Sequence, residues 1–469
     1  MLLILAASAL SAELVGSAYV PLEDPVYKLI EQCEMRGLIP VGSLNVRPIT
    51  RLKAATFLLE AAVDYELLGD RILQADLDYY IREYSEECIR LAKEIKPEKR
   101  SVRSLSYNPI PSIKASHWHL IRYKNDTFRF ICDPLFTFRR DWKTDSEGWN
   151  VARRSWGVRF WGDLSGGLGY YFQFVDRLER GRGKYLSRED LLEDRYGYVG
   201  PLLGGKETYY DQTDAHLGLK VGRFDLFFGK DRPAWGPSAD RLLIGGQGPS
   251  YDNLRVGLRL TDFLRFTYLL GKLHPWDVPT DPLYRTEEGW TRLATVNKWL
   301  TAHRLDVAIG DNVTIGLSEA LVWGERGLDI AYLNPLNFLF SAEHDGGDQD
   351  NVLLSVDASC RVLNRGRVWG ALLIDDLKLS TIGKGNPGNK VGWTGGIEAG
   401  DCGVDGLGAR LDYTRLEPYV YSHFYPVNRF SHWTTCLGSD LKPNSDRLRG
   451  SFSMRPYREI EIDLSLIHI

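Results

Sequence analysis

The chain has 469 residues, a net charge of −4, 43% hydrophobic residues and 12% aromatic residues. The weak negative charge argues against nucleic acid as the partner. Beyond the first dozen residues there is no run of about 20 apolar residues, which excludes a membrane protein built from helices. A transmembrane β-barrel passes this test, because only every second strand residue faces lipid.

The two ends of the sequence suggest an exported protein whose gene is not fully covered. Residues 1–12 are apolar and then small, and they resemble a partial signal peptide without its basic region. A buried strand or helix is the alternative. The chain stops at Ile469 without the aromatic residue that closes the last strand of many outer-membrane barrels, so we expect a truncated C-terminus.

Residues 20–100 are expected to form a small helical domain. A first helix follows a cap at Asp24 and Pro25 and ends at Gly37. Thr50 can cap a second helix, and a third is expected from Asp70 to Ile95, before a proline.

From about residue 110 to residue 469 the hydrophobic period changes to two, which is typical of strands with one apolar and one polar face. Residues 254–260, for example, read LRVGLRL. A soluble sandwich would alternate in the same way. However, tight connections alternate with long ones, which favours a barrel with short periplasmic turns and long external loops. Counting hairpins gives about 16 strands, or 18 with a missing last pair. Two-residue hairpin turns are expected at Asp311-Asn312 and Arg365-Gly366.

The cost of placing a charge against lipid, roughly 2–4 kcal/mol at mid-membrane, predicts which face points inward. The charged strand residues should therefore line the lumen: Lys220, Arg255, Arg259, Arg265, Arg304, Asp306, Arg410 and Asp412. They are expected either to pair with one another in the wall or to form a selective path for ions or sugars.

Several segments resemble the Wzi family of capsule assembly proteins. Near the N-terminus these are YVPLEDPVY at 19–27, RGLI at 36–39 and RPITR at 47–51. In the barrel region they are WGP at 235–237, followed by LRV at 254–256, and ERGL at 325–328, followed by LNPLNF at 333–338. The resemblance implies an outer-membrane barrel of eighteen strands with a periplasmic helical bundle. It also implies a lectin-like role, attaching or helping to assemble capsular or other surface polysaccharide.

Under this hypothesis external loops hold the polysaccharide, with aromatic rings against the sugars and polar groups on their hydroxyls. The candidate contact residues are Arg232, Trp235, Trp276, Trp290 and Tyr421, with Arg232 to Gly236 preferred because that stretch combines a cation, a rigid turn and an exposed type of indole. Neighbouring loop aromatics, including Tyr419, Phe424 and Tyr425, supply similar groups. Packing in the aromatic girdle or within the loops is the alternative for any one of them.

Catalytic motifs are lacking in the sequence, so we expect no enzyme activity and no cofactor. The acidic stretch 341–351 loosely resembles a calcium loop without its ordered ligands, and we expect a solvated loop and no metal. The six cysteines have no metal-ligand spacing; Cys33 and Cys88 are either unpaired or a disulfide. The partners expected besides polysaccharide are outer-membrane lipid and a periplasmic partner of the helical domain. The alternative function is a porin-like channel for small solutes.

Overall fold

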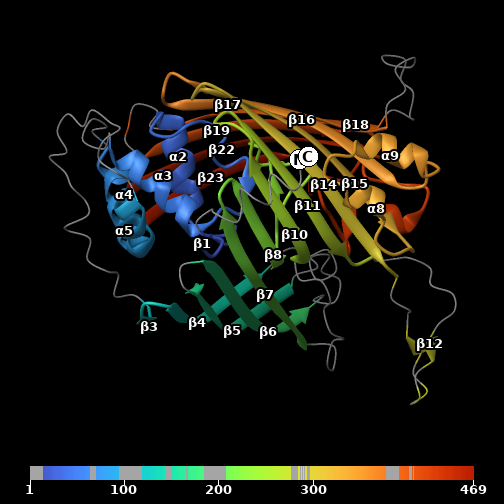
Figure 1. Ribbon diagram of the computed structural model, residues 1–469, viewed down its shortest axis with the longest axis horizontal. Coiled ribbons are helices and arrows are strands. Elements are labelled where there is room, and N and C mark those ends of the chain that lie inside the picture. Colours follow the sequence, from blue (N-terminus) through green and yellow to red (C-terminus); the bar gives the residue numbers. More distant parts are fainter. Residues whose placement is uncertain are drawn as a thin grey trace.

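The computed structural model describes residues 14–63, 70–94, 119–142, 149–164, 167–183, 207–275, 284–285, 287, 289, 291–292, 296–376, 390–400, 404 and 406–469. The proposed signal segment 1–12 lies outside these ranges. Strands dominate the fold and run between two clusters of helices at opposite ends of the molecule (Figure 1). Within the described ranges, no helix has the length and apolar character needed to cross a bilayer.

Among the residues described near the N-terminus, four helices pack around a shared apolar core: α2 (Val26–Arg36), α3 (Arg51–Val63), α4 (Arg71–Glu83) and α5 (Ser85–Glu94). The predicted caps are present: Thr50 Oγ1 accepts a hydrogen bond from Lys53 N at 3.1 Å, and Gly37 takes a left-handed φ of 76°. The single third helix that we predicted is wrong, because the chain breaks at Tyr84. The break lets the fully buried Tyr84 ring enter the core beneath Arg51, whose guanidinium lies 4.0 Å from the ring centroid.

In the described part of the chain, the remaining main elements form one sheet of seventeen strands. Strand β1 (Leu14–Gly16) lies against β7, and the other sixteen follow one another in antiparallel order. These sixteen are β3 (Ile121–Lys124), β4 (Phe128–Trp142), β5 (Trp149–Leu164), β6 (Leu168–Gly183), β7 (Glu207–Val221), β8 (Phe224–Asp231), β10 (Tyr251–Arg259), β11 (Leu264–Leu273), β14 (Lys298–Ile309), β15 (Val313–Gly324), β16 (Asn351–Val362), β17 (Gly366–Asp376), β18 (Lys390–Ala399), β19 (Leu407–Leu416), β22 (Ser445–Tyr457) and β23 (Ile460–His468). Short elements lie between them: β2 (Val46–Arg47), β9 (Ala234–Trp235), β12 (Tyr284–Arg285), β13 (Thr291–Arg292), α8 (Ile330–Leu333), α9 (Leu339–Asp345), η5 (Pro426–Asn428), β20 (Ser431–His432) and β21 (Thr435–Cys436).

Short turns join the strands at one end and long connections join them at the other, as the sequence predicted. The two-residue hairpins that we predicted are wrong in detail, because three residues separate the paired strand ends in each case. At 363–365 the chain reverses through left-handed backbones at Leu363 and Asn364, with φ values of 54° and 51°.

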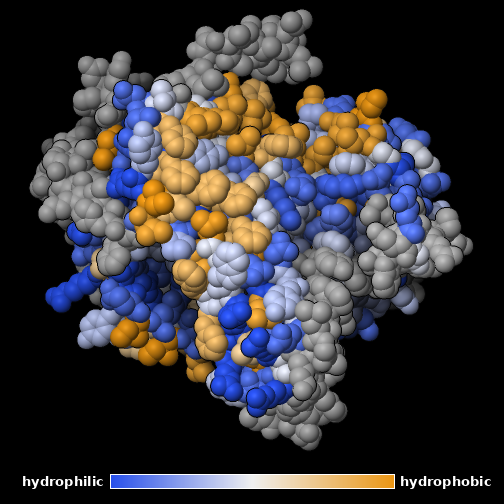
Figure 2. Space-filling model, turned by 90° about the horizontal axis from the view of Figure 1, so that it is seen from below, coloured by the Kyte–Doolittle hydropathy of each residue, from blue (hydrophilic) through white to orange (hydrophobic). Residues whose placement is uncertain are grey.

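The outer face of the sheet is apolar. Leu317, Val356, Leu372 and Trp393 are cross-strand neighbours on four successive strands and are each 40–46% exposed. Figure 2 shows a broad hydrophobic area on one face of the molecule. A water-soluble sheet would bury such a row, whereas a sheet surrounded by lipid exposes it.

The helical domain lies at the short-turn end of the barrel. Val41 N donates to Asp311 O in the β14–β15 turn at 3.0 Å, and Asn45 Nδ2 donates to Asp306 and Thr314 at 3.1 and 3.0 Å. In Figure 1 helices α2–α5 lie at the end opposite α8 and α9. The segment that makes these contacts, residues 37–48, is called the inserted segment below.

Docking of the helical domain should depend on pH through Glu34 of α2, which is 1% exposed. Burial raises the pKa of Glu34 to about 7, although Arg367 opposes the shift. Its contribution to stability is therefore complete below about pH 4.5 and is lost as the pH rises through about 7. Glu34→Gln should flatten the dependence of the melting temperature on pH between 5 and 8.

Glu31 is the matched control for this experiment. Burial opposes ionisation of Glu31, but Arg47 outweighs it and holds the pKa at about 2. Glu31→Gln should therefore lower the melting temperature by the same amount at every pH between 5 and 8. Equal slopes for wild type and Glu34→Gln would contradict the assignment.

Candidate functional site

The lumen is crossed by backbone contacts between the inserted segment and the long β8–β10 connection, residues 232–250, which is called the plug loop. Strand β2 of the inserted segment pairs with β9 of the plug loop, Val46 opposite Trp235 and Arg47 opposite Ala234. Gly236 N donates to Asn45 O at 2.8 Å, at a left-handed φ of 97° that favours glycine. The plug loop thus folds into the barrel and meets the helical domain there.

A second long connection, from the same long-loop end of the barrel, packs against the plug loop. This connection, residues 417–444 between β19 and β22, is called the rim loop. Gly245 N donates to Leu437 O at 2.6 Å, and the Tyr421 hydroxyl donates to Leu242 O at 2.6 Å. An apolar core forms between the two loops and the inner wall, including Leu242, Ile244, Leu269, Leu300, Leu353 and Phe430. The lumen is therefore apolar near the long loops.

Charged side chains line the inner wall nearer the short turns, and many of them are paired. Arg304 is 1% exposed, donates to both carboxylate oxygens of Asp357 at 2.6 and 2.9 Å, and donates to Asp306 at 3.0 Å. Gly316 makes room for the guanidinium, because a Cβ there would lie 2.2 Å from Arg304 Nη2. Farther along the wall, Asp412 accepts from Arg410 at 2.8 Å. These contacts are typical of a wall whose charges pair with one another, which was one of the two alternatives for the lumen; the other was a selective path for ions or sugars.

Three predicted lumen arginines lie toward the short turns beside α3. Arg255 donates to Asp231 Oδ2 at 2.5 Å. Arg259 and Arg265 line a cavity that also reaches Lys53 of the helical domain.

The candidate polysaccharide residues do not come together on an external surface. Trp276 and Trp290 lie outside the described residues. Trp235 is 3% exposed and Tyr421 is 7% exposed, so the expectation of an exposed indole at 235 is wrong. The plug loop turns inward, and its aromatic ring packs in the core between the loops.

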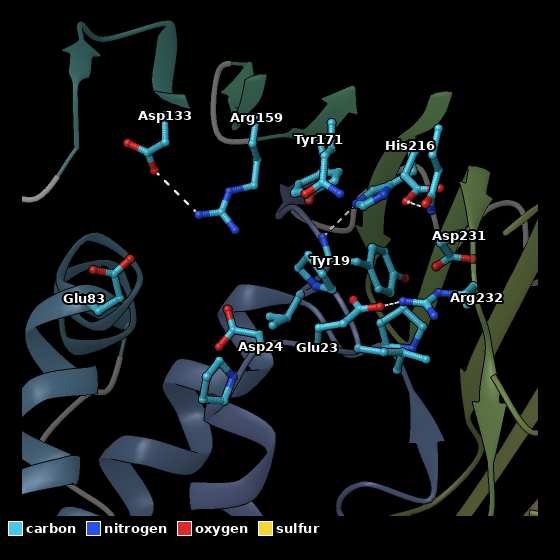
Figure 3. A pocket seen from close by; sticks show the side chains of 18 of the residues that line it. Tyr19, Glu23, Asp24, Glu83, Asp133, Arg159, Tyr171, His216, Asp231 and Arg232 are labelled. Atoms are coloured by element: carbon cyan, nitrogen blue, oxygen red, sulfur yellow. Dashed lines mark hydrogen bonds and ion pairs between the residues drawn. The ribbon is translucent and has the colours of Figure 1, made fainter. Parts of the chain in front are cut away.

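Arg232 lines a cavity of about 620 Å³ between residues 19–25 and the wall of β4–β8. Its guanidinium forms an ion pair with Glu23 across this cavity (Figure 3). Tyr171 stacks on His216 at 4.9 Å between ring centroids, and His216 Nε2 accepts from Tyr19 N at 3.0 Å. The cavity thus has a mixed aromatic and charged lining.

The rim loop presents several exposed aromatic groups at the long-loop end. Phe424 is 93% exposed, Tyr419 is 61% exposed and Tyr425 is 47% exposed. Tyr419, Tyr421 and Trp433 take left-handed backbones with φ of 66°, 69° and 53°, which large residues rarely adopt. Such strain clusters at functional sites. The sequence had suggested Tyr419, Phe424 and Tyr425 only as neighbouring aromatics, and it gave no signal for Trp433 or for the strained backbone.

One group of possible metal ligands occurs in the described residues, at Glu343, His344 and Asp348 beside α9. His344 and Asp348 are exposed, and His344 Nδ1 lies 2.7 Å from Phe340 O in its own helix. Burial, and after it the charge of Asp348, raise the pKa of Glu343 to about 7.

An apolar exterior, a charged and partly filled interior and alternating short and long connections define an outer-membrane type of β-barrel with a plugged lumen. The chain is similar in structure to Wzi of Escherichia coli, described as a carbohydrate-binding β-barrel involved in group 1 capsule assembly. The match has a TM-score of 0.54 and 14% identity, and covers 97% of this chain and 85% of Wzi. It confirms the predicted fold and the resemblance to Wzi at the level of structure.

Two further solved structures superpose with lower TM-scores. OpdK of Pseudomonas aeruginosa, solved with vanillate, gives a TM-score of 0.34 at 12% identity over 72% of this chain and 92% of its own. OmpF of Salmonella typhi, in complex with daunomycin, gives 0.40 at 9% identity over 74% and 92%. No family model matches the sequence, and no curated protein matches it.

Proposed function

We propose that the protein is an outer-membrane barrel that attaches or helps to assemble surface polysaccharide at its long-loop end, acting by binding and without catalysis. The observation that carries the proposal is the rim loop, which presents Tyr419, Phe424 and Tyr425 to solvent at that end. Aromatic rings are suitable platforms for the CH faces of sugars. The similarity to Wzi, a carbohydrate-binding barrel by its description, supports the same function.

The filled lumen favours an attachment role over the porin-like alternative. The plug loop is tied to the wall by Asp240, whose carboxylate accepts from Thr414 Oγ1 at 2.8 Å and pairs with Arg447. It is also tied to the inserted segment and the rim loop by backbone hydrogen bonds. These contacts connect the helical domain, which we place in the periplasm with a partner there, to the external loops.

Polysaccharide binding can be tested with surface polymer isolated from the source cells and protein in detergent micelles. Phe424→Ala combined with Tyr425→Ala should weaken binding about tenfold or more, which corresponds to roughly 1.4 kcal/mol. Trp235→Ala should act through stability, because its ring has no access to the outside.

The control removes exposed apolar groups elsewhere at the same end of the barrel. Ile330 begins α8 and Leu336 follows that helix; they are 83% and 81% exposed. Ile330→Ala combined with Leu336→Ala should leave binding unchanged. Absence of binding by wild type, or equal losses in the two double variants, would defeat the proposal.

A further inference from the structure

A cavity of about 370 Å³ lies at the short-turn end of the barrel, between α3 and the ends of β7, β8, β10 and β11. Its charged lining consists of six basic and two acidic residues: Lys53, Lys220, Arg223, Arg255, Arg259 and Arg265, with Glu60 and Asp225. We call it the basic cavity. The larger cavity beside it shares Tyr19 and Pro48 as lining but contains more carboxylates than arginines. The excess positive charge is therefore a local property of the basic cavity.

Four of these cations have no ionic partner of their own in the described part of the chain. Lys53, Lys220, Arg259 and Arg265 form no ion pair with a carboxylate there, in contrast to the paired arginines deeper in the wall. Like charges gathered around one cavity repel one another, although water reduces the repulsion at the exposed side chains of Lys220 and Arg259. An anion in the cavity would remove that repulsion.

Arg255 supplies independent evidence for a missing acceptor. The residue is 5% exposed, its Nη2 donates to Asp231, and its guanidinium lies 3.8 Å from the Phe227 ring centroid. Its Nη1, however, is buried and has no partner among the described residues. Buried donors are normally satisfied, so an unpaired guanidinium nitrogen in this wall indicates an acceptor that the chain itself does not provide.

Lys53 of α3 responds to the same electrostatic environment. Burial, followed by the charge of Arg265, lowers the pKa of Lys53 to about 7. An ammonium in such surroundings loses its charge easily unless an anion accompanies it.

The geometry points to an oxyanion site: the basic cavity binds a phosphate or diphosphate group between the helical domain and the barrel wall. Phosphate carries about −1.5 to −2 charges at neutral pH and offers several acceptor oxygens, which suits converging arginine and lysine donors. The cavity volume falls in the range of small-molecule sites, about 300–1,000 Å³. This site is at the opposite end from the rim loop and does not depend on polysaccharide binding there.

The test uses the full chain in detergent, titrated with inorganic pyrophosphate at constant ionic strength and followed by melting temperature and calorimetry. Wild type should bind pyrophosphate and melt at a higher temperature with it. Arg259→Gln combined with Arg265→Gln should lose at least tenfold in affinity. Without anion, the same variant should melt at or above the wild-type temperature, because the substitutions relieve repulsion between the cations. If Arg259 and Arg265 served only to stabilise the fold, their loss would lower the melting temperature.

The control, Arg365→Gln combined with Arg458→Gln, removes two cations at the same end but outside the basic cavity, and should bind pyrophosphate as wild type does. Native mass spectrometry of freshly purified protein distinguishes the two possible sources of the bound phosphate group. A phospholipid that wild type retains and the Arg259/Arg265 variant lacks would assign the site to a lipid headgroup. Bound free phosphate would assign it to a small anion. Either result supports the site. No effect of pyrophosphate on wild type, equal responses of the two double variants, or preference for a galacturonic acid trimer would overturn it.

Discussion

Replacing Arg304 with methionine should destabilise the folded barrel by about 3–5 kcal/mol. The guanidinium is 1% exposed and holds two carboxylates, those of Asp306 and Asp357. Methionine fills similar space but leaves both carboxylates in the wall without their cation, and a buried uncompensated charge costs several kcal/mol. Asp306 also accepts from Asn45, so the variant should loosen the inserted segment as well.

The measurement is a urea titration in detergent, with the folded fraction read from heat-modifiable mobility on a gel. Arg410→Met is the matched control. Its side chain is 24% exposed, and its partner Asp412 keeps a second arginine, Arg449, at 3.0 Å. The control should cost about 1 kcal/mol or less. Similar costs for the two variants would mean that the wall around Arg304 is hydrated.

Placing a charge on the outer face should be almost as costly. Leu372 is 40% exposed in the middle of β17, between Val356 and Trp393 of the neighbouring strands. If this face meets lipid, Leu372→Arg should cost roughly 2–4 kcal/mol for folding into lipid vesicles. If the face met water, the same change would fall within about 0.5 kcal/mol of wild type.

Leu363 provides the control within the next turn. It is 91% exposed at the tip of the β16–β17 connection, outside the apolar band. Leu363→Arg should change the stability by less than about 0.5 kcal/mol. A small cost for both variants would contradict a lipid-facing exterior, since both leucines are exposed and only their surroundings differ.

The strands and their faces were predictable from the sequence because each depends on local signals. Alternation at residues 254–260 required only a period of two, and the cost of charge in lipid then placed Arg255 inside, where it is 5% exposed. The caps at Thr50 and Gly37 are equally local. The break at Tyr84 was missed because packing of its ring against Arg51 decides it, and that contact is not local.

The conformation of the long connections, and which of their side chains are buried, could not be predicted in the same way. Their place in long connections suggested that Trp235 and Tyr421 are exposed on external loops, with packing within the loops as the alternative. Instead, both side chains are buried where the plug loop and the rim loop meet. That arrangement depends on contacts between residues nearly two hundred positions apart, such as Tyr421 with Leu242, which no period in the sequence encodes. The sequence named Tyr419, Phe424 and Tyr425 among the loop aromatics, but only the structure separates these exposed rings from the buried Trp235 and Tyr421.

The central claim is that the membrane barrel is closed by its own loops, so that it attaches a polymer and does not conduct solutes. The most direct test records the current across a planar lipid bilayer that contains the purified protein. We expect no steady opening for wild type, because the plug loop joins the inserted segment below and the rim loop above. A steady conductance of the size of an open porin would contradict the closed lumen and favour a channel.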